Sequence, residues 1–216
     1  MKKKFSLIIS NTARSFEYLK CLSNSKLIPE YILYLNNNSN NKFFKIFKKK
    51  KFFFSNLKPK IFKTKKINKS VSKYILSHKT NNIIYSGYPG IILKNKKLLS
   101  QKNLIHSHPG KLPEYKGSTT IYYSLLKDKK IFCSTLILNN KIDSGEVLFI
   151  KKYSIPKNIK KIDKDFDNKI RSKNILLYLK KCRSKNIVSK NKNTYPYFVI
   201  HPLLRSIVFK KYEKNF

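Results

Sequence analysis

The first 35 residues predict a strand, a helix and a second strand, and no other feature of the sequence constrains the fold as strongly. Residues 5–10 (FSLIIS) and 31–35 (YILYL) are short apolar runs typical of buried strands. Between them apolar residues recur at helical spacing, with Asn11 or Thr12 as the N-cap. A strand, a helix and a strand in so short a span form a βαβ unit with a right-handed crossover. The sequence therefore predicts an α/β fold built on a parallel sheet.

The rest of the chain continues the alternation of strands and helices. It predicts a Rossmann-like open, mostly parallel sheet with helices on both faces over residues 1–155. A short, basic, helical C-terminal extension is expected over residues 156–216. Further strands are expected at 83–86, 104–107, 132–138 and 147–155, and helices near 71–77, 120–126 and 173–182.

The chain is strongly basic, with 49 Lys and Arg against 10 Asp and Glu among 216 residues, a formal net charge of +39. Such a charge is typical of proteins that bind nucleic acids or anionic membranes. Only four of the basic residues are Arg, which makes the bidentate contacts to phosphates and bases. The abundant Lys, Asn, Ile, Phe and Tyr are all specified by A/T-rich codons. We therefore favour base composition as the cause of the charge, and a nucleic-acid-binding surface stays open.

Residues 36–70 are a Lys-, Asn- and Phe-rich insertion or loop. Residues 41–70 hold 12 Lys and no acidic residue. We expect an irregular loop or a distorted helix whose Phe side chains pack on the sheet, namely Phe43, Phe44 and Phe52 to Phe54. A basic surface interleaved with aromatic side chains, for nucleic acid or acidic lipid, is the alternative.

The cellular location is expected to be cytoplasmic. The longest apolar runs are far shorter than the roughly 18–20 residues of a membrane span, and the N-terminal apolar run lacks a small-residue cleavage pattern. We therefore expect neither a membrane span nor a signal peptide. The three cysteines form no CxxC pair, which favours reduced thiols, at Cys21, Cys133 and Cys182.

Residues typical of a functional site gather between positions 87 and 145. All five glycines and two of the four histidines lie there, beside the ends of expected strands. Glycine permits positive φ and close approach of a ligand, and ligands of open α/β sheets bind outside the carboxyl ends of the strands. The glycines are Gly87, Gly90, Gly110, Gly117 and Gly145.

Within this window, residues 106–117 (HSHPGKLPEYKG), followed later by Asp143-Ser144-Gly145, carry a recognisable pattern. The pattern resembles the catalytic signature of the 10-formyltetrahydrofolate-dependent formyltransferases, which act on methionyl-tRNA, glycinamide ribonucleotide or amino sugars. In that family an Asn precedes the catalytic His by two positions. A Leu-Pro pair follows the His, then a Gly, and much later an Asp before a small residue and a Gly. His108 and Asp143 match this spacing, whereas His106 stands where the family has Asn.

The resemblance implies a formyltransferase fold and a division of chemical roles. When an amine attacks a formyl carbon, negative charge develops on the formyl oxygen and the amine must lose a proton. By resemblance, His108 donates to the oxygen and Asp143 orients His108, raises its pKa and helps to take the proton. His106 is the auxiliary donor in place of the Asn.

The resemblance also implies where the substrates bind. The acceptor amine is expected near Asn11, Arg14, Lys116 and Gly117. The co-substrate 10-formyltetrahydrofolate is expected near Gly87, Tyr88, Gly90, Leu112, Pro113, Leu138 and Asn139.

Each histidine taken alone leaves other roles open. We expect His106 and His108 to face opposite sides of their strand, so a structural role stays open for either one. A zinc site that joins them to Cys133 lacks further ligands at motif spacing, and we expect no metal.

The sequence favours a formyltransferase that acts on an amino sugar, with a nucleotide-linked amino sugar as the favoured substrate. The tRNA enzymes of the family carry a substantial C-terminal RNA-binding domain, whereas only about 60 residues follow Ile155 here. Methionyl-tRNA is the alternative acceptor because of the charge. A non-catalytic, basic nucleic-acid-binding protein on the same scaffold is the second alternative. The oligomeric state is not fixed by the sequence.

Overall fold

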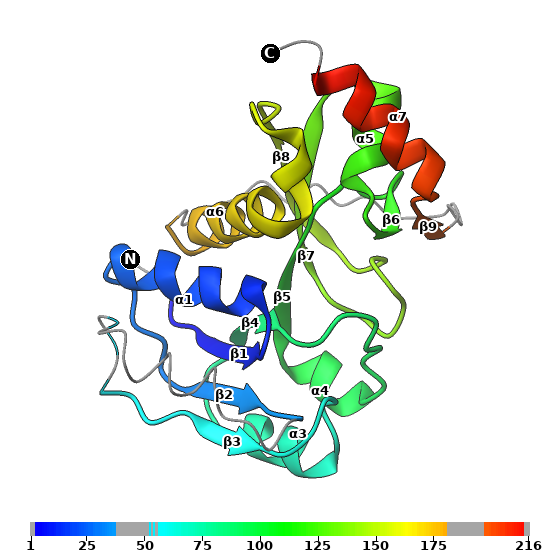
Figure 1. The fold of residues 1–216 in the computed structure, drawn as a ribbon. Helices are drawn as coiled ribbons and strands as arrows, with labels where there is room; N and C mark the ends of the chain where they lie inside the picture. The colour runs from blue at the N-terminus through cyan, green and yellow to red at the C-terminus, as the bar shows by residue number, and fades with distance from the viewer. Residues whose placement is uncertain (1–2, 38–51, 53, 55, 181–196, 214–216) are drawn as a thin grey trace.

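A seven-stranded sheet organises the computed structural model, which describes residues 3–37, 52, 54, 56–180 and 197–213. Its strands are β1 (Ser6–Ser10), β2 (Ile32–Leu35), β3 (Lys60–Phe62), β4 (Asn82–Ser86), β5 (Asn103–His108), β7 (Ile131–Ile137) and β8 (Val147–Tyr153). Their order is β3-β2-β1-β4-β5-β7-β8, as Figure 1 shows. The first five strands in this order are parallel. Strand β7 is antiparallel to β5, and β8 is antiparallel to β7. A separate two-stranded parallel sheet joins β6 (Lys116–Ser118) to β9 (Tyr197–Val199).

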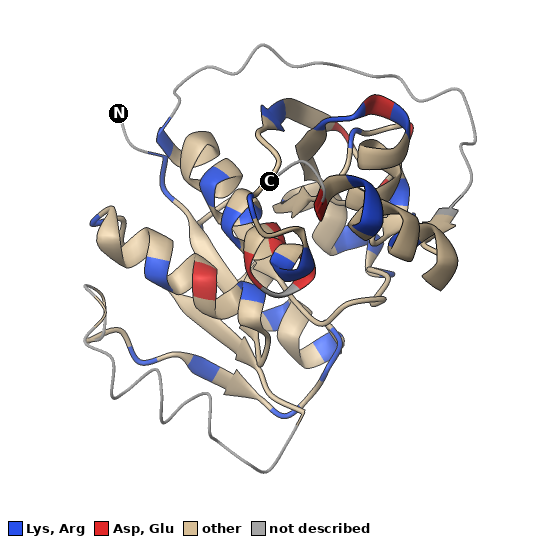
Figure 2. Ribbon diagram, turned by 45° about the horizontal axis from the view of Figure 1, so that its top comes forward, with Lys and Arg blue, Asp and Glu red and all other residues tan. Residues whose placement is uncertain are grey.

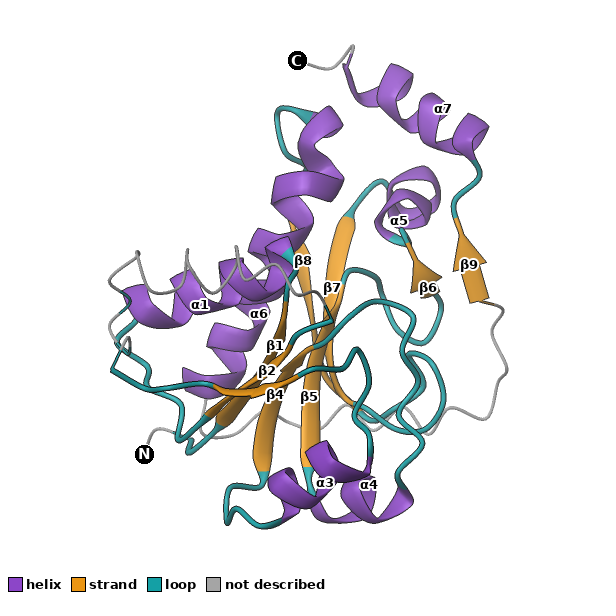
Figure 3. Ribbon diagram, turned by 60° about the horizontal axis from the view of Figure 1, so that its bottom comes forward, coloured by secondary structure: helices purple, strands orange, loops and turns teal. Residues whose placement is uncertain are grey.

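Helices cover both faces of the large sheet, which confirms the predicted fold class (Figure 3). On one face α1 (Ala13–Asn24) and α6 (Asp167–Lys180) pack against each other. On the other face lie α3 (Lys69–Leu76) and α4 (Lys96–Gln101). At one end of the molecule α5 (Ile121–Asp128) packs with α7 (Pro202–Glu213), near a 3₁₀ turn at Ile159–Lys161 and a π-helical turn at Ile162–Phe166.

The central strand β1 shows why the sequence is apolar without alternation. Leu7 and Ile9 pack in the cluster under α1 and α6, whereas Ile8 packs in the cluster under α3. All five residues of the strand are buried. Strands of a parallel sheet that are covered on both faces have continuous apolar runs, as here.

The first crossover begins at Thr12, one of the two predicted N-cap residues. Its Oγ1 accepts a hydrogen bond from the Ser15 N–H at 3.2 Å. This bond satisfies one of the N–H groups that a helix start leaves without an intrahelical partner. Asn11 is exposed and makes no such bond.

The described part of residues 36–70 contains both a confirmed and a wrong expectation. Phe52 and Phe54 are buried in the cluster under α1, as predicted. Residues 60–62 form the edge strand β3 rather than a loop or a distorted helix, because β2 has an open edge and its backbone groups pair there. Phe43, Phe44 and Phe53 lie outside the described residues.

The predicted boundary between residues 155 and 156 stays a prediction. Beyond it, α6 lies on the large sheet, and its buried Asn174 donates to the Cys133 carbonyl oxygen at 2.8 Å. The helix expected at residues 173–182 begins earlier, at Asp167, and is described to Lys180, so Cys182 falls outside the described residues. Helix α7 lies within the extension that is expected to be helical, in a part for which the sequence gives no bounds of an individual helix.

Basic residues are distributed over most helices and several loops, with few acidic ones between them (Figure 2). Among the described residues no helix is long and apolar enough to cross a membrane.

Candidate functional site

A pocket of about 420 Å³ opens at the carboxyl ends of β1, β4 and β5. The strand order reverses between β1 and β4, and open α/β sheets bind ligands at such a switch point. Loops after β4, β5 and β7 complete its walls. We call it the central pocket; it is lined by Arg14, Tyr85, Tyr88, Pro89, Gly90, Ile91, Ile92, Leu93, His106, His108, Gly117, Ser118, Thr119, Leu138, Asn139, Lys141, Ile142, Asp143 and Arg171.

Serines at the ends of β1 and β4 hold the first helix against the pocket. The Ser15 hydroxyl donates to the Ser86 carbonyl oxygen at 2.9 Å, and so does the Ser10 hydroxyl. Arg14, in the first turn of the same helix, donates from Nε to Ser86 Oγ at 3.2 Å and from a terminal nitrogen to the Gly87 carbonyl oxygen. These bonds fix the guanidinium of Arg14 in the pocket wall.

His106 lies on β5 with its ring in the pocket. Its Nδ1 lies 3.2 Å from the Tyr85 carbonyl oxygen, which can only accept, so Nδ1 carries the proton of the neutral ring. Burial lowers the pKa of His106 well below its usual 6.5, and the nearby Arg14 and Arg171 lower it further. His106 is therefore neutral at pH 7, with its Nε2 lone pair not engaged by the Tyr85 bond.

His108 shares the pocket with His106, so the expectation that the two face opposite sides was wrong. Residues two apart in a strand point to the same side. Ser107, between them, points to the other side and contacts Cys133 Sγ at 3.1 Å. Cys133 is thus turned away from both histidines. No group of three metal-ligating side chains occurs among the described residues.

Both ring nitrogens of His108 face protein groups. Nε2 donates to the Tyr115 carbonyl oxygen at 2.7 Å, and Nδ1 lies 3.5 Å from Asp143 Oδ2. Burial lowers the pKa of His108, and the Asp143 carboxylate opposes that shift. Because Nε2 is held by an acceptor, Nδ1 carries a proton only in the cationic ring, and Asp143 favours that form.

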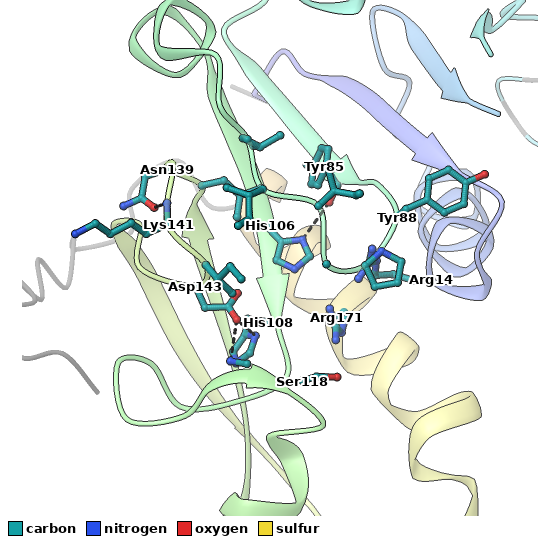
Figure 4. A pocket seen from close by; sticks show the side chains of 18 of the residues that line it. Arg14, Tyr85, Tyr88, His106, His108, Ser118, Asn139, Lys141, Asp143 and Arg171 are labelled. Carbon is teal, nitrogen blue, oxygen red and sulfur yellow. Dashed lines mark hydrogen bonds and ion pairs between the residues drawn. The ribbon is translucent and has the colours of Figure 1, made fainter. Parts of the chain in front are cut away.

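The Asp143 carboxylate is held by the loop between β7 and β8. Asp143 has a φ of +46°, an uncommon value for a residue with a side chain. Its Oδ2 accepts a hydrogen bond from the Gly117 N–H at 3.0 Å, and only 11 % of its side chain is exposed. Asp143 thus points at His108, as Figure 4 shows. In the same view Arg14 and Arg171 lie on the other side of His106 from Asp143.

Arg171 reaches the pocket from α6 and is partly neutralised. Its Nε donates to Asp167 Oδ1 at 2.8 Å and its NH1 donates to the Ser107 carbonyl oxygen at 3.0 Å. In the part of the chain that the structure describes, no carboxylate lies within ion-pair distance of Arg14. Of the two guanidiniums near His106, that of Arg171 is therefore paired with Asp167, which does not line the pocket, whereas no described carboxylate pairs with Arg14.

The structure brings most of the sequence-predicted residues together. The pocket wall contains Arg14, Tyr88, Gly90, His106, His108, Gly117, Leu138, Asn139 and Asp143. Gly87 is in contact with Arg14 through its carbonyl oxygen. Not in the wall are Asn11, Leu112, Pro113 and Lys116, of which Leu112 and Lys116 are buried.

The sequence reasoning missed Arg171 and the apolar residues 91–93. Residues 91–93 form a loop without periodicity, so nothing in the sequence distinguishes them from other apolar positions. For Arg171 a signal was present: the chain contains only four Arg against 45 Lys, and two of those four line this pocket.

Comparison with known sequences gives one similar curated protein and no matching family model. The chain is 29% identical over 89 residues to methionyl-tRNA formyltransferase from Helicobacter pylori. The match covers 41% of this chain and 29% of that protein, so the chain spans less than a third of the relative's length in the match.

Solved structures share the fold at low sequence identity. A sugar N-formyltransferase from Shewanella sp. FDAARGOS_354 aligns with a TM-score of 0.60 at 16% identity, over 95% of this chain and 86% of that one. Phosphoribosylglycinamide formyltransferase from Bacillus halodurans aligns at 0.59 and 14%, over 86% and 100%. The corresponding enzyme from Campylobacter jejuni aligns at 0.58 and 18%, over 82% and 97%.

Proposed function

The chain has the fold of the formyltransferases, and on that premise we propose that it transfers a formyl group from 10-formyltetrahydrofolate to a primary amine. The acceptor that we favour is an amino sugar linked to a nucleotide. The observation that carries the proposal is the pair of His108 and Asp143 in the wall of the central pocket, 3.5 Å apart.

The chemistry of this pair suits acyl transfer. Negative charge develops on the formyl oxygen as the amine attacks, and a donor aimed at that oxygen lowers the barrier. The cationic form of His108 carries a proton on Nδ1, and the buried Asp143 carboxylate stabilises that form. Asp143 also orients the ring, since His108 is anchored at Nε2 by the Tyr115 carbonyl oxygen.

The pocket fits the proposed co-substrate. A flat, largely apolar ring system needs an apolar wall with a few polar groups at its edge. Ile91, Ile92 and Leu138 provide such a wall, and Asn139 and Lys141 lie at its rim. The volume of about 420 Å³ lies within the range of roughly 300–1,000 Å³ that ligand pockets occupy. When bound, 10-formyltetrahydrofolate would supply the formyl group.

The charge of the wall favours an acceptor that carries an anion. The wall holds Arg14, Lys141 and Arg171 against the carboxylate of Asp143, and Asp167, outside the wall, pairs with Arg171. A phosphate or diphosphate on the acceptor would offset this surplus, and guanidiniums bind such groups in a bidentate manner. A nucleotide-linked amino sugar satisfies this demand, while a neutral amine does not.

Methionyl-tRNA stays the second candidate acceptor, because the similar curated protein acts on it and the chain is basic. The non-catalytic candidate, a nucleic-acid-binding protein on this scaffold, is supported by the same positive charge. The buried Phe52 and Phe54 are not exposed for base stacking, which weakens that candidate. The free thiols Cys21 and Cys133 suit the proposed cytoplasmic location.

The experiment that tests the function follows the release of tetrahydrofolate from 10-formyltetrahydrofolate. The purified protein is incubated with nucleoside-diphosphate-linked amino sugars, with glycinamide ribonucleotide and with methionyl-tRNA. Release with an amino sugar supports the favoured acceptor, and release only with methionyl-tRNA replaces it. Absence of release with every acceptor, together with salt-dependent RNA binding, would move the function to nucleic-acid binding.

A further inference from the structure

We infer that His106 is the proton acceptor of the pocket: its Nε2 takes the proton that the attacking amine loses. The inference rests on the proposed formyl transfer and reverses the auxiliary donor role that the resemblance implies for this position. Where the family signature has the amide of an Asn, which can donate, this chain has a ring nitrogen that can only accept.

The hydrogen bond to Tyr85 determines which nitrogen of His106 is available. A backbone carbonyl oxygen accepts and never donates, so the 3.2 Å contact places the ring proton on Nδ1. The neutral ring then has a lone pair on Nε2. The ring is partly exposed, and its exposed part lies in the wall of the central pocket.

The groups around His106 keep it in the neutral form. Arg14 approaches from α1, Arg171 from α6 and His108 from β5, and all three disfavour a positive charge on His106. The ring of Tyr85 on β4 lies edge to face at 6.4 Å between centroids. The other charged groups of the pocket wall are Lys141 and Asp143, from the loop after β7.

His108, two residues along the same strand, has a carboxylate beside its ring, which His106 lacks. Asp143 lies 3.5 Å from its Nδ1 and favours the cationic ring. Burial lowers the pKa of both rings, and the Asp143 carboxylate opposes that shift for His108, so His108 is the easier of the two to protonate. We therefore assign proton acceptance to His106 and leave with His108 the donor role that the resemblance implies, from Nδ1 of its cationic ring, because its Nε2 is held by the Tyr115 carbonyl oxygen.

The transfer balances with these two roles. The lone pair of the amine nitrogen forms the new bond to the formyl carbon. The bond from that carbon to the folate nitrogen breaks, and its electron pair stays on the folate nitrogen, which gains a proton. The amine nitrogen loses one proton to His106 Nε2, and the release of that proton from His106 balances the proton that the folate nitrogen takes up, so the ring regains its neutral form. No oxidant, reductant or metal is needed.

An anionic acceptor, once bound, would make His106 a stronger base. Arg14 and Arg171 lower the basicity of His106 in the unliganded pocket. A phosphate bound between these guanidiniums offsets their charge, so the proton affinity of His106 rises when the acceptor is in place. Inorganic phosphate can serve as the probe of this coupling.

The tautomer is tested first, by nuclear magnetic resonance of protein labelled with ¹⁵N in histidine. The signals of His106 are those that disappear in His106→Asn. We expect a neutral ring at pH 7 with the proton on Nδ1, and a protonation midpoint that rises on addition of inorganic phosphate. A proton on Nε2 would overturn the inference.

Kinetics then separate proton acceptance from hydrogen-bond donation. His106→Asn restores the amide of the family signature, so a donor role predicts wild-type turnover for this variant. A proton-acceptor role predicts a fall in kcat of about a hundredfold or more, with the affinity for 10-formyltetrahydrofolate unchanged. Added imidazole should restore part of the turnover of His106→Ala, in proportion to its free-base concentration.

His78→Asn is the matched control. The Nδ1 of His78 also bonds to a backbone carbonyl oxygen, that of Tyr74 at 2.8 Å, but His78 lies outside the central pocket. This variant should keep wild-type turnover. Absence of tetrahydrofolate release by the wild-type protein with every acceptor would overturn the proposed function itself. Wild-type release that persists undiminished in His106→Asn would overturn only the role of His106.

Discussion

Arginine, aspartate and tyrosine side chains meet in two regions of this molecule, the central pocket and the contact of α7 with the rest of the chain. At the α7 contact, Arg205 donates from NH2 to Asp163 Oδ2 at 2.7 Å and from Nε to the Tyr122 hydroxyl at 3.1 Å. The same Tyr122 hydroxyl donates to Asp163 Oδ2 at 2.7 Å. Each charge in this contact has an opposite charge beside it.

In the central pocket the charges do not match in this way. Arg14 bonds only to uncharged oxygens, of Ser86 and Gly87, and Arg171 has the carboxylate of Asp167. A charge that is removed from water without a partner costs stability, so a fold keeps one only where it gains something else. The comparison teaches that a matched cluster joins elements of this fold, whereas a surplus of charge marks the place of a ligand.

The largest effect is expected from Asp143→Asn. The amide cannot stabilise the cationic form of His108, so kcat for formyl transfer should fall by about a hundredfold or more, with binding of 10-formyltetrahydrofolate nearly unchanged. Tetrahydrofolate release under single-turnover conditions measures it. Asp163→Asn, in the matched cluster, is the control and should keep its turnover; equal turnover of both variants would remove Asp143 from the site.

A smaller effect is expected from Arg14→Gln. The loss of a guanidinium bonded to an anionic group costs about 1.5–3 kcal/mol, which corresponds to a rise of about ten- to a hundredfold in KM for a phosphate-bearing acceptor. The free energy of unfolding should not fall, since a charge without a carboxylate partner has been removed. Arg205→Gln should behave in the opposite way, with an unchanged KM and lower stability. A KM that stays constant in Arg14→Gln would show that the surplus charge does not bind the acceptor.

The pH dependence of stability should differ between wild type and His106→Asn. The pKa of His106 is lowered in the folded protein, so below about pH 6.5 the unfolded chain binds a proton that the folded chain does not. Stability is therefore full above that pH and is lost as the pH falls, by at most about 1.4 kcal/mol per pH unit from this group. Urea unfolding at pH 7.5, 6.5 and 5.5 should show a shallower loss for His106→Asn. Parallel losses in the two proteins would contradict the neutral state of His106.

The smallest effect is expected in the matched cluster. Asp163→Asn weakens two hydrogen bonds to a carboxylate that is 33 % exposed, so the free energy of unfolding should fall by about 1 kcal/mol. Urea unfolding measures this change. The more exposed pair of Lys160 and Glu213 offers the comparison, because its loss in Lys160→Gln should change stability by less than about 0.5 kcal/mol. Equal losses of unfolding free energy in the two variants would show that the matched cluster does not stabilise the packing of α7.

Much of the fold followed from local pattern, and the exceptions have physical causes. Strands β1 and β2 and helix α1 were predictable because their apolar residues repeat with the period of the element. Strand β3 is three residues long and exists because β2 offers it an edge, which is a tertiary cause. Helix α4 has six residues, with Leu98 its buried side chain, too few to establish a period.

The motif predicted the central residues of the candidate site, whereas the sequence did not predict how the other side chains are arranged around them. The spacing from His108 to Asp143 predicted two side chains that do meet. Because β5 and β7 are antiparallel, the loop after β7 that carries Asp143 has to reach back along β5 to His108 at its end. The sequence placed Arg171 in a basic extension, away from the site. Helix α6 crosses back over the sheet and so brings Arg171 to the pocket, although the two are far apart in the chain. The shared orientation of His106 and His108 was open to prediction from the alternation along a strand and was misjudged.

The pairing of β6 with β9 sets the order in which a newly made chain can complete its pocket. Gly117, whose N–H donates to Asp143, pairs within this small sheet with Phe198, and Thr119 Oγ1 accepts from the Ile200 N–H at 3.1 Å. A methyl group at Gly117 would lie 2.2 Å from the Phe198 carbonyl oxygen, so the two strands fit without spare room. During synthesis the large sheet can assemble once β8 has emerged. Strand β6, which carries Gly117, obtains its pairing strand only 44 residues after the end of β8, when β9 arrives.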